Sequence, residues 1–443
     1  MSRLVIMLFL AIFGVSLQAA APTTTFAYLT SSLSYEVQLH QVDPLNPDAV
    51  IAPISIALPA KHDLSQAAFS PDGKRIAMWL RSEEYFELYL YQLGTSALDK
   101  MGQFPVWDPS GDFFDSRSIA LNWSPDSRYV AFNSYDGTAI NTYLLNVGDL
   151  GLVTAITGIA YNSLTGGFPL ALAWSGDSTR LALVEDECHN VDIGLLCSNA
   201  IHAITIPDFK PIVQIKTEGT ICHLQWSPDN RYISFERECD LNMIFYYSDV
   251  YLLSVAQGSI QRLTHLSTPS DDSFSWDNTY ATARSSIWYD ANTLLLGTAT
   301  AKRAPVQTMP VAETAIYHPK TGRAAKLGDD VAVGWVRNPI SGEFAYAAAP
   351  VTGIDGLGFS SGAGFIRIAT FDGEQLSVVA QMSQPDLFRY DLKWSFDGRF
   401  VSFSNIASQG YTYSFLDKST GEVTHFDTSL QSDFGSGWIE KSP

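Results

Sequence analysis

The stretch Trp226-Ser-Pro-Asp-Asn-Arg-Tyr-Ile-Ser-Phe235 decides the fold, because the chain repeats it with small changes. An aromatic residue ends one β-prone run, Ser-Pro-Asp followed by Asn, Ser or Gly makes a tight turn, and an apolar run begins directly afterwards. The pattern therefore predicts a strand, a turn and a second strand in each copy. Four further copies occupy residues 69–78, 123–132, 174–183 and 394–403.

The aromatic residue that ends the first strand recurs along the chain, at steps of 54, 51, 52, 62, 47, 59 and 44 residues. Repeats of about 40–50 residues with several short strands are typical of β-propeller blades. Each unit predicts four antiparallel strands, which we call A to D from the ring axis outward. The aromatic series is Phe69, Trp123, Trp174, Trp226, Trp288, Trp335, Trp394 and Trp438.

The two ends of the sequence predict how the ring closes. Residues 25–30, 36–42 and 50–56 read as strands B, C and D, whereas residues 433–439 read as an A strand without a B strand. A blade shared between the ends would remove exposed edge strands. We therefore expect an all-β chain, with one propeller domain of eight four-stranded antiparallel blades over residues 22–443. Seven blades is the alternative, because the units at Trp288 and Trp335 lack the Ser-Pro-Asp turn.

Residues 1–21 predict a signal peptide, since Arg3 precedes an apolar run over residues 4–17 and small residues follow it. The run is shorter than the roughly 20 apolar residues of a membrane span. An uncleaved anchor helix is the alternative. We expect a secreted or periplasmic protein with no membrane span once this segment is removed.

The chain has 46 acidic and 27 basic side chains, a net charge of −19. Nucleic acids and anionic membranes both require a basic surface, so this charge argues against either as a partner. We expect a monomer whose acidic surface serves solubility.

The cysteines cluster in two adjacent units. In an exported chain four clustered cysteines predict two disulfides. We favour the most local of the three pairings, Cys188 with Cys197 and Cys222 with Cys239. Because His189 and His223 each follow a cysteine, zinc is an alternative, although the spacing matches no standard zinc motif. The four cysteines are Cys188, Cys197, Cys222 and Cys239.

Acidic and histidine side chains surround these cysteines, where B–C loops are expected. Oxygen ligands of this kind suit Ca²⁺, and a solvated charged face is the simpler explanation. We assign no other cofactor and no catalytic residue. The candidate binding residues are Asp186, Glu187, His189, Asp192, His223, Glu236, Glu238 and Asp240.

Two further motifs are interpreted as structural. The repeated turn carboxylates, such as Asp229, are expected to accept backbone N–H bonds, because copies spread around a ring cannot converge on one substrate. Residues 358–362, Gly-Phe-Ser-Ser-Gly, match the G-x-S-x-G nucleophile pattern. That chemistry requires a strand, a sharp turn and a helix, whereas we expect a glycine-rich loop between strands B and C here.

The five motif copies resemble the WD40-like PD40 repeats of the TolB family of periplasmic β-propellers, and Gln261-Arg-Leu-Thr264 resembles that family's D-strand ending. The resemblance implies a propeller fold and an exported location. The chain differs from TolB in two respects. The segment before the first motif is too short for TolB's α/β domain, and the blade count exceeds TolB's six.

The long insertions all lie on the face formed by the B–C and D–A loops. Loops on a rigid scaffold commonly carry recognition. We therefore predict an exported, non-catalytic propeller that binds a protein or a glycan through this face. The alternative is a hydrolase or lyase with an acidic site at the channel mouth, which would need converging titratable side chains there. The insertions span residues 185–199, 238–248, 267–280, 299–312 and 349–363.

Overall fold

The computed structural model of this protein describes most of the chain after its N-terminal segment. Every regular element that it describes is a β-strand. The described residues are 24–32, 35–49, 51–105, 121–135, 140–149, 152–159, 172–191, 194–218, 221–237, 247–265, 279–302, 311–355, 358–361, 364–384, 391–407, 410–428 and 434–440.

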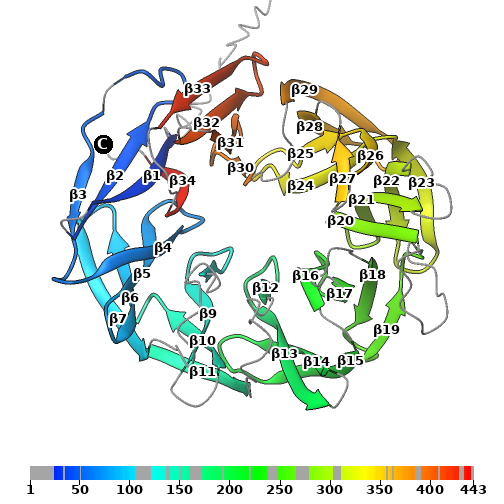
Figure 1. The fold of residues 1–443 in the computed structure, drawn as a ribbon, viewed down its shortest axis with the longest axis horizontal. Coiled ribbons are helices and arrows are strands. Elements are labelled where there is room, and N and C mark those ends of the chain that lie inside the picture. The colour runs from blue at the N-terminus through cyan, green and yellow to red at the C-terminus, as the bar shows by residue number, and fades with distance from the viewer. Residues whose placement is uncertain are drawn as a thin grey trace, which may run out of the picture.

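Eight four-stranded antiparallel blades form a ring around a central axis (Figure 1). In each blade the A strand lies nearest the axis and the D strand lies outermost. The chain leaves the axis through strands A to D and returns to it to begin the next blade. From A to D, blade 1 consists of β34 (Ser436–Glu440), β1 (Thr24–Ser32), β2 (Glu36–Val42) and β3 (Ile54–Ala57), and blade 2 of β4 (Asp63–Phe69), β5 (Arg75–Arg81), β6 (Tyr85–Gln92) and β7 (Ala97–Pro105). Blade 3 consists of β8 (Asn122–Trp123), β9 (Tyr129–Tyr135), β10 (Ile140–Asn146) and β11 (Leu152–Ile159), and blade 4 of β12 (Leu172–Trp174), β13 (Arg180–Val191), β14 (Gly194–Thr205) and β15 (Pro211–Glu218).

The second half of the ring repeats this arrangement. A short parallel contact, Tyr247 with Ala281 and Ser248 with Thr282, links blades 5 and 6. From A to D, blade 5 consists of β16 (Ile221–Trp226), β17 (Tyr232–Arg237), β18 (Tyr247–Ser254) and β19 (Ser259–Arg262), and blade 6 of β20 (Thr279–Asp290), β21 (Thr293–Lys302), β22 (Val311–His318) and β23 (Gly322–Gly328). Blade 7 consists of β24 (Val331–Arg337), β25 (Phe344–Ala349), β28 (Gly364–Phe371) and β29 (Leu376–Gln384), and blade 8 of β30 (Lys393–Trp394), β31 (Phe400–Ala407), β32 (Gly410–Asp417) and β33 (Val423–Asp427).

The first and last strands close the ring within blade 1. The C-terminal strand β34 pairs antiparallel with β1, so that Thr24 lies opposite Glu440 and Phe26 opposite Trp438. The units at Trp288 and Trp335 form complete blades 6 and 7. The predicted all-β fold, the eight blades and the shared closing blade are therefore confirmed, and the seven-bladed alternative is wrong.

Each Ser-Pro-Asp motif forms the turn between strands A and B. In blade 5 the Ser227 hydroxyl donates to Asp229 Oδ1 at 2.8 Å, and Asp229 Oδ1 accepts the backbone N–H of Arg231 at 3.2 Å. Ser227 Oγ also accepts the N–H of Tyr232 at 2.9 Å. Asn230 completes the turn at φ +59°, a left-handed conformation that Asn tolerates. The turn carboxylate thus has the predicted structural role.

Tryptophans on the A strands connect neighbouring blades. Trp226 Nε1 donates to the backbone oxygen of Ala173 at 3.0 Å, and Ala173 lies on the A strand of the preceding blade. A buried indole needs such an acceptor for its N–H. Equivalent bonds join Trp123 to Ala68, Trp174 to Asn122, Trp394 to Val336 and Trp438 to Lys393.

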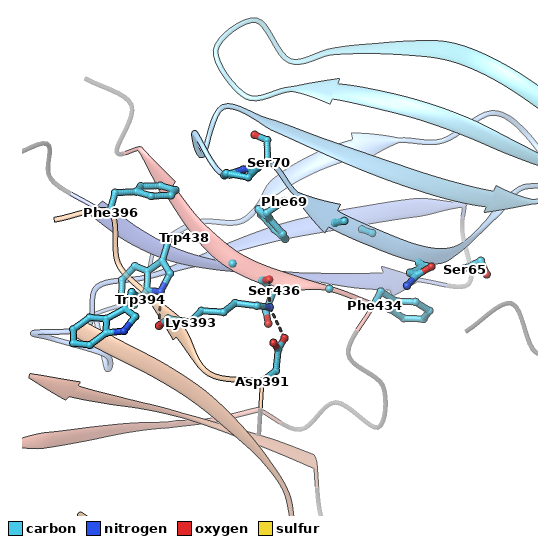
Figure 2. A pocket seen from close by; sticks show the side chains of 16 residues that line it. Ser65, Phe69, Ser70, Asp391, Lys393, Trp394, Phe396, Phe434, Ser436 and Trp438 are labelled. Atoms are coloured by element: carbon cyan, nitrogen blue, oxygen red, sulfur yellow. Dashed lines mark hydrogen bonds and ion pairs between the residues drawn. The ribbon is translucent and has the colours of Figure 1, made fainter. Parts of the chain in front are cut away.

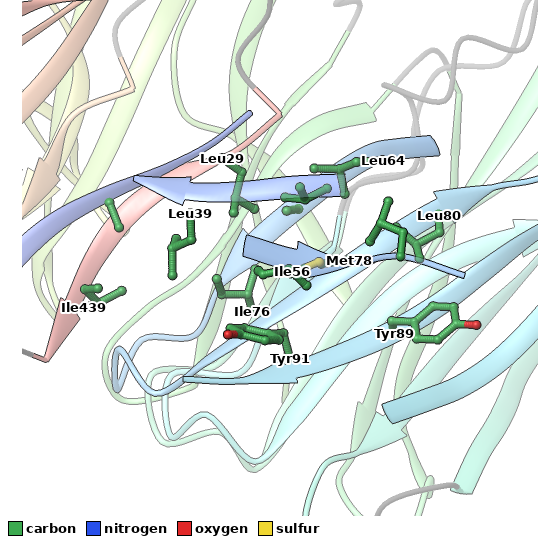
Figure 3. Close-up of a cluster of buried hydrophobic side chains, with 14 residues drawn as sticks. Leu29, Leu39, Ile56, Leu64, Ile76, Met78, Leu80, Tyr89, Tyr91 and Ile439 are labelled. Atoms are coloured by element: carbon green, nitrogen blue, oxygen red, sulfur yellow. The ribbon is translucent and has the colours of Figure 1, made fainter. Parts of the chain in front are cut away.

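Apolar side chains fill the space between blades. Between blades 1 and 2, Leu29 and Leu39 pack with Ile76, Met78 and other aliphatic side chains (Figure 3). Between blades 8 and 1 the core is aromatic instead, and the ring centroids of Phe26 and Phe415 lie 5.1 Å apart. Burial of this apolar surface is the main force that holds the blades together.

Two of the predicted insertion loops form hairpins. Residues 185–199 were expected to form a loop, but β13 and β14 continue as a hairpin from Arg180–Val191 to Gly194–Thr205. Residues 349–363 contain a small hairpin of β26 (Val351–Asp355) and β27 (Gly358–Ser361). The expected loop there is wrong in the same way. The G-x-S-x-G pattern therefore begins in a hairpin strand.

Candidate functional site

One pair of predicted site residues comes together at the start of the A strand of blade 5. Strand β16 has a bulge here, because the pairing passes from Cys222 with Glu236 to Gln225 with Ser234. Within the bulge His223 adopts φ +54°. Its Nδ1 lies 3.2 Å from Oε1 of Glu236, whose side chain is only 5% exposed. The hydrogen bond to Glu236 raises the pKa of His223, although burial acts in the opposite direction.

The other predicted site residues are only partly described. Asp186, Glu187 and His189 lie on strand β13, but their side chains are outside the description. Strand register places Cys188 directly opposite Cys197. Cys222 lies on β16, with its side chain also outside the description. The remaining candidates lie outside the described residues; they are Asp192, Glu238, Cys239 and Asp240.

A second histidine–carboxylate pair, which the sequence analysis missed, lies in the neighbouring blade 4. His202 Nε2 on β14 is 2.5 Å from Glu185 Oε2 on β13. The two residues are diagonal neighbours, because Glu185 pairs with Ala200 and Leu183 with His202. Once the hairpin register is known, this contact follows from diagonal proximity across strands.

A cavity of about 480 Å³ lies beside the ring axis, where the ring closes. Its walls are the A strands of three consecutive blades, β30, β34 and β4 (Figure 2). Ser65, Asp391 and Phe434 lie near the beginnings of these strands, and therefore towards the D–A loops. Ser70 and Phe396 lie at the opposite end, in the A–B turns. The cavity thus runs along the inner wall towards the face predicted to bind a ligand.

Two residues that line this cavity each have a buried side-chain atom without a partner among the described residues: Ser65 Oγ and Gln66 Oε1. Because these atoms have almost no accessible surface, they do not open onto the cavity. Strand β4 has a bulge where these two consecutive residues lie, since Leu64 pairs with Leu80 and Gln66 pairs with Trp79, leaving Ser65 as the extra residue. Bulges change the direction of side chains along a strand, and they are common next to active sites.

The charged side chains of the cavity compensate one another. Lys393 Nζ lies 2.5 Å from Asp391 Oδ2 and donates to the backbone oxygen of Ser436 at 2.7 Å. The ammonium group therefore links blade 8 to the closing blade, and Figure 2 shows it extending between these two groups. The pair adds no net charge to the cavity.

Gly435, which directly precedes β34, and Gly437 on β34 allow this part of the chain to approach β4 closely. A Cβ on Gly435 would lie 2.4 Å from the backbone oxygen of Ala67, and one on Gly437 would lie 2.8 Å from Cβ of Phe69. The two A strands share a backbone hydrogen bond from Ala67 N to Phe434 O, 2.7 Å long. The remaining wall is aromatic, from Phe69, Phe396, Phe434, Trp394 and Trp438.

The sequence contained a signal for this site. Gly435 and Gly437 both lie within the three residues before Trp438, whereas none of the five motif copies has two glycines in the three residues before its aromatic residue. The first copy has Phe69 where the other four have tryptophan. Both departures lie where the A strands of blades 1 and 2 meet, beside the cavity. We call this contact the closing interface.

Among the described residues, no group of three or more His, Cys, Asp or Glu side chains is arranged to hold a metal ion. That part of the chain also has no helix with the length and hydropathy of a membrane span.

Comparison with known proteins gives structural likeness only. No protein-family model matches the chain, and no curated protein sequence matches it. Similar solved structures include the β-propeller domain of the Trilobed protease from Pyrococcus furiosus (13% identity, 84% of this chain and 99% of that chain, TM-score 0.45). A second is a eukaryotic initiation factor (11% identity, 94% of this chain and 99% of that chain, TM-score 0.49). A third is TolB from Acinetobacter baumannii (14% identity, 83% of this chain and 81% of that chain, TM-score 0.31). The likeness concerns the fold and extends no further. The described residues define an eight-bladed β-propeller with a polar, aromatic-walled cavity at its closing blade.

Proposed function

We propose that this chain is an exported binding module, and that its ligand enters from the face formed by the D–A and B–C loops. The observation that carries the proposal is the cavity between β30, β34 and β4. Its walls combine the polar side chains of Lys393 and Asp391 with the aromatic residues Phe69, Phe396 and Phe434. Concave sites with a few convergent polar groups are where ligands usually bind.

The loop face around blades 4 and 5 is proposed as the outer part of the same recognition surface. His223 is the third residue of β16, and Ser65 is the third residue of β4. All A strands run in the same direction along the axis, so both residues lie towards the D–A end of the ring. An exposed histidine held by Glu236 would offer a polar contact on this face.

Export and kinship with TolB-like PD40 proteins are also proposed. The signal-peptide pattern of residues 1–21 and the five motif copies support them. Expression of the full chain in a secreting host tests export. We expect the exported protein to begin at about residue 22, as read by N-terminal sequencing. An intact N-terminus on exported protein would contradict cleavage.

A disulfide between Cys188 and Cys197 belongs to the same proposal, because the two residues are directly opposed in the strand register. Peptide mapping without reduction tests it. We expect one peptide pair joining Cys188 to Cys197 and a second joining Cys222 to Cys239. A different pairing, or four free thiols in exported protein, would contradict it.

Binding itself is tested by capture from the extracellular fraction of the native source. Immobilised wild-type protein is compared with Asp391→Trp. Asp391 lines the cavity with a side chain that is 66% exposed, so an indole at this position would narrow the cavity without overpacking the core. We expect the variant to keep the melting temperature and to retain about tenfold less of the captured protein or glycan. Equal capture by both proteins would contradict a role for the cavity. Release of a chemically altered ligand would favour the hydrolase or lyase alternative.

A further inference from the structure

We propose that the inner edge of strand β13 binds an extended, basic segment of a partner protein, which adds to blade 4 as a further β-strand. This inference rests on the proposed binding function and specifies the chemistry of its partner. Two independent observations support it: an uncovered strand edge on the loop face, and an excess of acidic residues around that edge.

Strand β13 is much longer than the A strand beside it. β12 pairs only with Leu181–Leu183 of β13, whereas β14, on the other side, pairs with β13 as far as Val191. Among the described residues, Val184–Val191 therefore have a strand partner on one side only. Because A strands lie nearest the ring axis, the uncovered side of β13 faces that axis (Figure 1).

Other blades leave much less of the B strand uncovered. In blade 2, β4 covers β5 to its last residue, since Asp63 lies opposite Arg81, and β20 covers β21 in the same way in blade 6. In the described parts of blades 1, 3 and 8, at most five residues of the B strand lack a strand partner towards the axis. The eight uncovered residues of β13 extend about 26 Å. Such an edge presents a row of main-chain N–H and C=O groups, and strand addition to it is a recurrent mode of peptide recognition.

The insertions around this edge are acidic. Residues 185–199, 238–248 and 267–280 contain nine acidic residues and no lysine or arginine. At the opposite end of the ring, turn carboxylates are balanced locally, as in the ion pairs of Asp229 with Arg231 and of Asp72 with Arg75. Complementary charge steers a partner to a surface and disfavours partners of the wrong sign, so the loop face favours a basic segment.

The edge and the charge together define the partner. Main-chain bonds along the edge require an extended segment but no particular sequence. The acidic surroundings require lysine or arginine side chains on that segment. A bound cation would use the charge without the edge, and an acidic strand would use the edge against the charge.

Three synthetic peptides test the two requirements separately. Full-length exported protein is titrated by calorimetry with a ten-residue peptide of alternating lysine and valine, blocked at both ends. The second peptide has glutamate in place of lysine, and the third is the lysine peptide with N-methyl groups on its four central residues, which removes hydrogen-bond donors from both of its edges. We expect saturable binding of the lysine peptide, and at least tenfold weaker binding of the other two. Hydrogen exchange in residues 184–191 should slow when the lysine peptide binds.

Two double variants assign the binding to this edge. Asp186→Asn with Glu187→Gln removes two carboxylates from β13 and should weaken binding of the lysine peptide about fivefold to tenfold. The matched control, Glu374→Gln with Glu422→Gln, removes two exposed carboxylates from the C–D turns at the opposite end of the ring and should bind as wild type. Unchanged melting temperatures for both double variants separate recognition from folding.

The inference is overturned if the lysine peptide does not bind, if the glutamate or the N-methylated peptide binds equally well, or if exchange in residues 184–191 is unchanged. Equal binding by wild type and the variant Asp186→Asn with Glu187→Gln would overturn it too. If the lysine peptide fails but the wild type still captures a partner that Asp391→Trp does not, this inference fails and the binding function stands. If neither occurs, both fail.

Discussion

Blade 1 contacts blade 8 on one side and blade 2 on the other, and different interactions hold these two interfaces together. Towards blade 8, Trp438 donates its indole N–H to Lys393 O at 3.3 Å within an aromatic core. Towards blade 2, the equivalent aromatic residue is Phe69, which has no N–H to donate. There the two A strands come close enough for the bond from Ala67 N to Phe434 O, and Gly435 and Gly437 make this approach possible.

This difference separates two ways of joining neighbouring blades. In the first kind, which we call an indole-sealed interface, a tryptophan N–H donates a hydrogen bond to a backbone oxygen of the neighbouring blade. Such an interface tolerates ordinary side chains on the facing strand. The closing interface depends on the absence of side-chain atoms, so that a single methyl group would be harmful. It is also the interface beside which the cavity lies.

The largest expected effect is that of Gly435→Ala. The new Cβ would lie 2.4 Å from Ala67 O, and the backbone φ of +149° is unfavourable for a side chain. We expect the free energy of unfolding to fall by about 3 kcal/mol, measured by urea denaturation. Gly328→Ala is the matched control, since nothing lies within 4 Å of its added Cβ. Equal stabilities for the two variants would show that the closing strands do not approach each other closely.

Glu87→Gln tests a second contact at the same interface. The side chain of Glu87 is 9% exposed, accepts from Lys100 Nζ at 2.7 Å and Tyr89 OH at 3.0 Å, and lies 3.1 Å from His62 Nε2. Glu87 and Tyr89 share one face of β6, and Tyr89 packs against blade 1. We expect a loss of about 2 kcal/mol at pH 7, with exposed Glu374→Gln as the control.

The pH dependence of this loss has a definite sign. Burial opposes ionisation of Glu87, but the bonds from Lys100 and Tyr89 outweigh it and lower the pKa of the carboxyl. The ionised group therefore stabilises the fold above its unfolded pKa of about 4.3, and this contribution is lost as the pH falls through the folded value. Wild type and Glu87→Gln should converge in stability in acid. A gap that widens on acidification would contradict the contact.

Two tryptophan substitutions measure how much the indole hydrogen bond contributes to the free energy of unfolding. Trp226 Nε1 donates to Ala173 O at 3.0 Å, whereas the buried Nε1 of Trp335 has no partner among the described residues. Replacing either with Phe removes similar volume, so the difference between them reports the hydrogen bond. We expect Trp226→Phe to be more destabilising than Trp335→Phe by about 1 kcal/mol, measured by denaturant unfolding. Equal losses would mean that these indoles stabilise by packing alone.

The smallest effect is expected for Asp177→Asn, in the turn of an indole-sealed blade. Burial opposes ionisation, but bonds from Ser175, Thr179 and Asn230 lower the pKa of Asp177 to about 2. Because the residue is exposed, we expect a loss of less than about 1 kcal/mol at pH 7. The ionised group contributes above pH ~4, and this contribution falls away towards pH 2. Thermal unfolding across that range, with exposed Asp48→Asn as the control, should show a shallower acid transition in Asp177→Asn alone.

The sequence predicted the ring but not its cavity, and the reason is physical. The turn chemistry of Ser227 and Asp229 is local, so a ten-residue motif predicts it, and the repeat then predicts eight blades and a shared closing blade. Residues 185–199 were predicted as a loop because both ends of this segment are rich in polar residues. In the structure, pairing between β13 and β14 continues through them and forms a hairpin. His223 and Glu236 were both identified, although their contact depends on a bulge in β16.

The cavity needed contacts that no local pattern encodes. Gln66 and Ser436 are far apart in sequence, and they come together only when the ring closes. The departures that mark the place, Phe69 in place of tryptophan and the two glycines before Trp438, are visible in the sequence. Their meaning is visible only when β34 lies against β4.

The pairing of Thr24 with Glu440 has a consequence for protein engineering. The ends of the described chain leave the ring at one point, so a short linker could join them without bending either strand. New termini could then be opened in another exposed turn, in a circularly permuted chain with the same blades. Reporter proteins fused at the two original ends would be held side by side. Their energy transfer would report directly on whether blade 1 is intact.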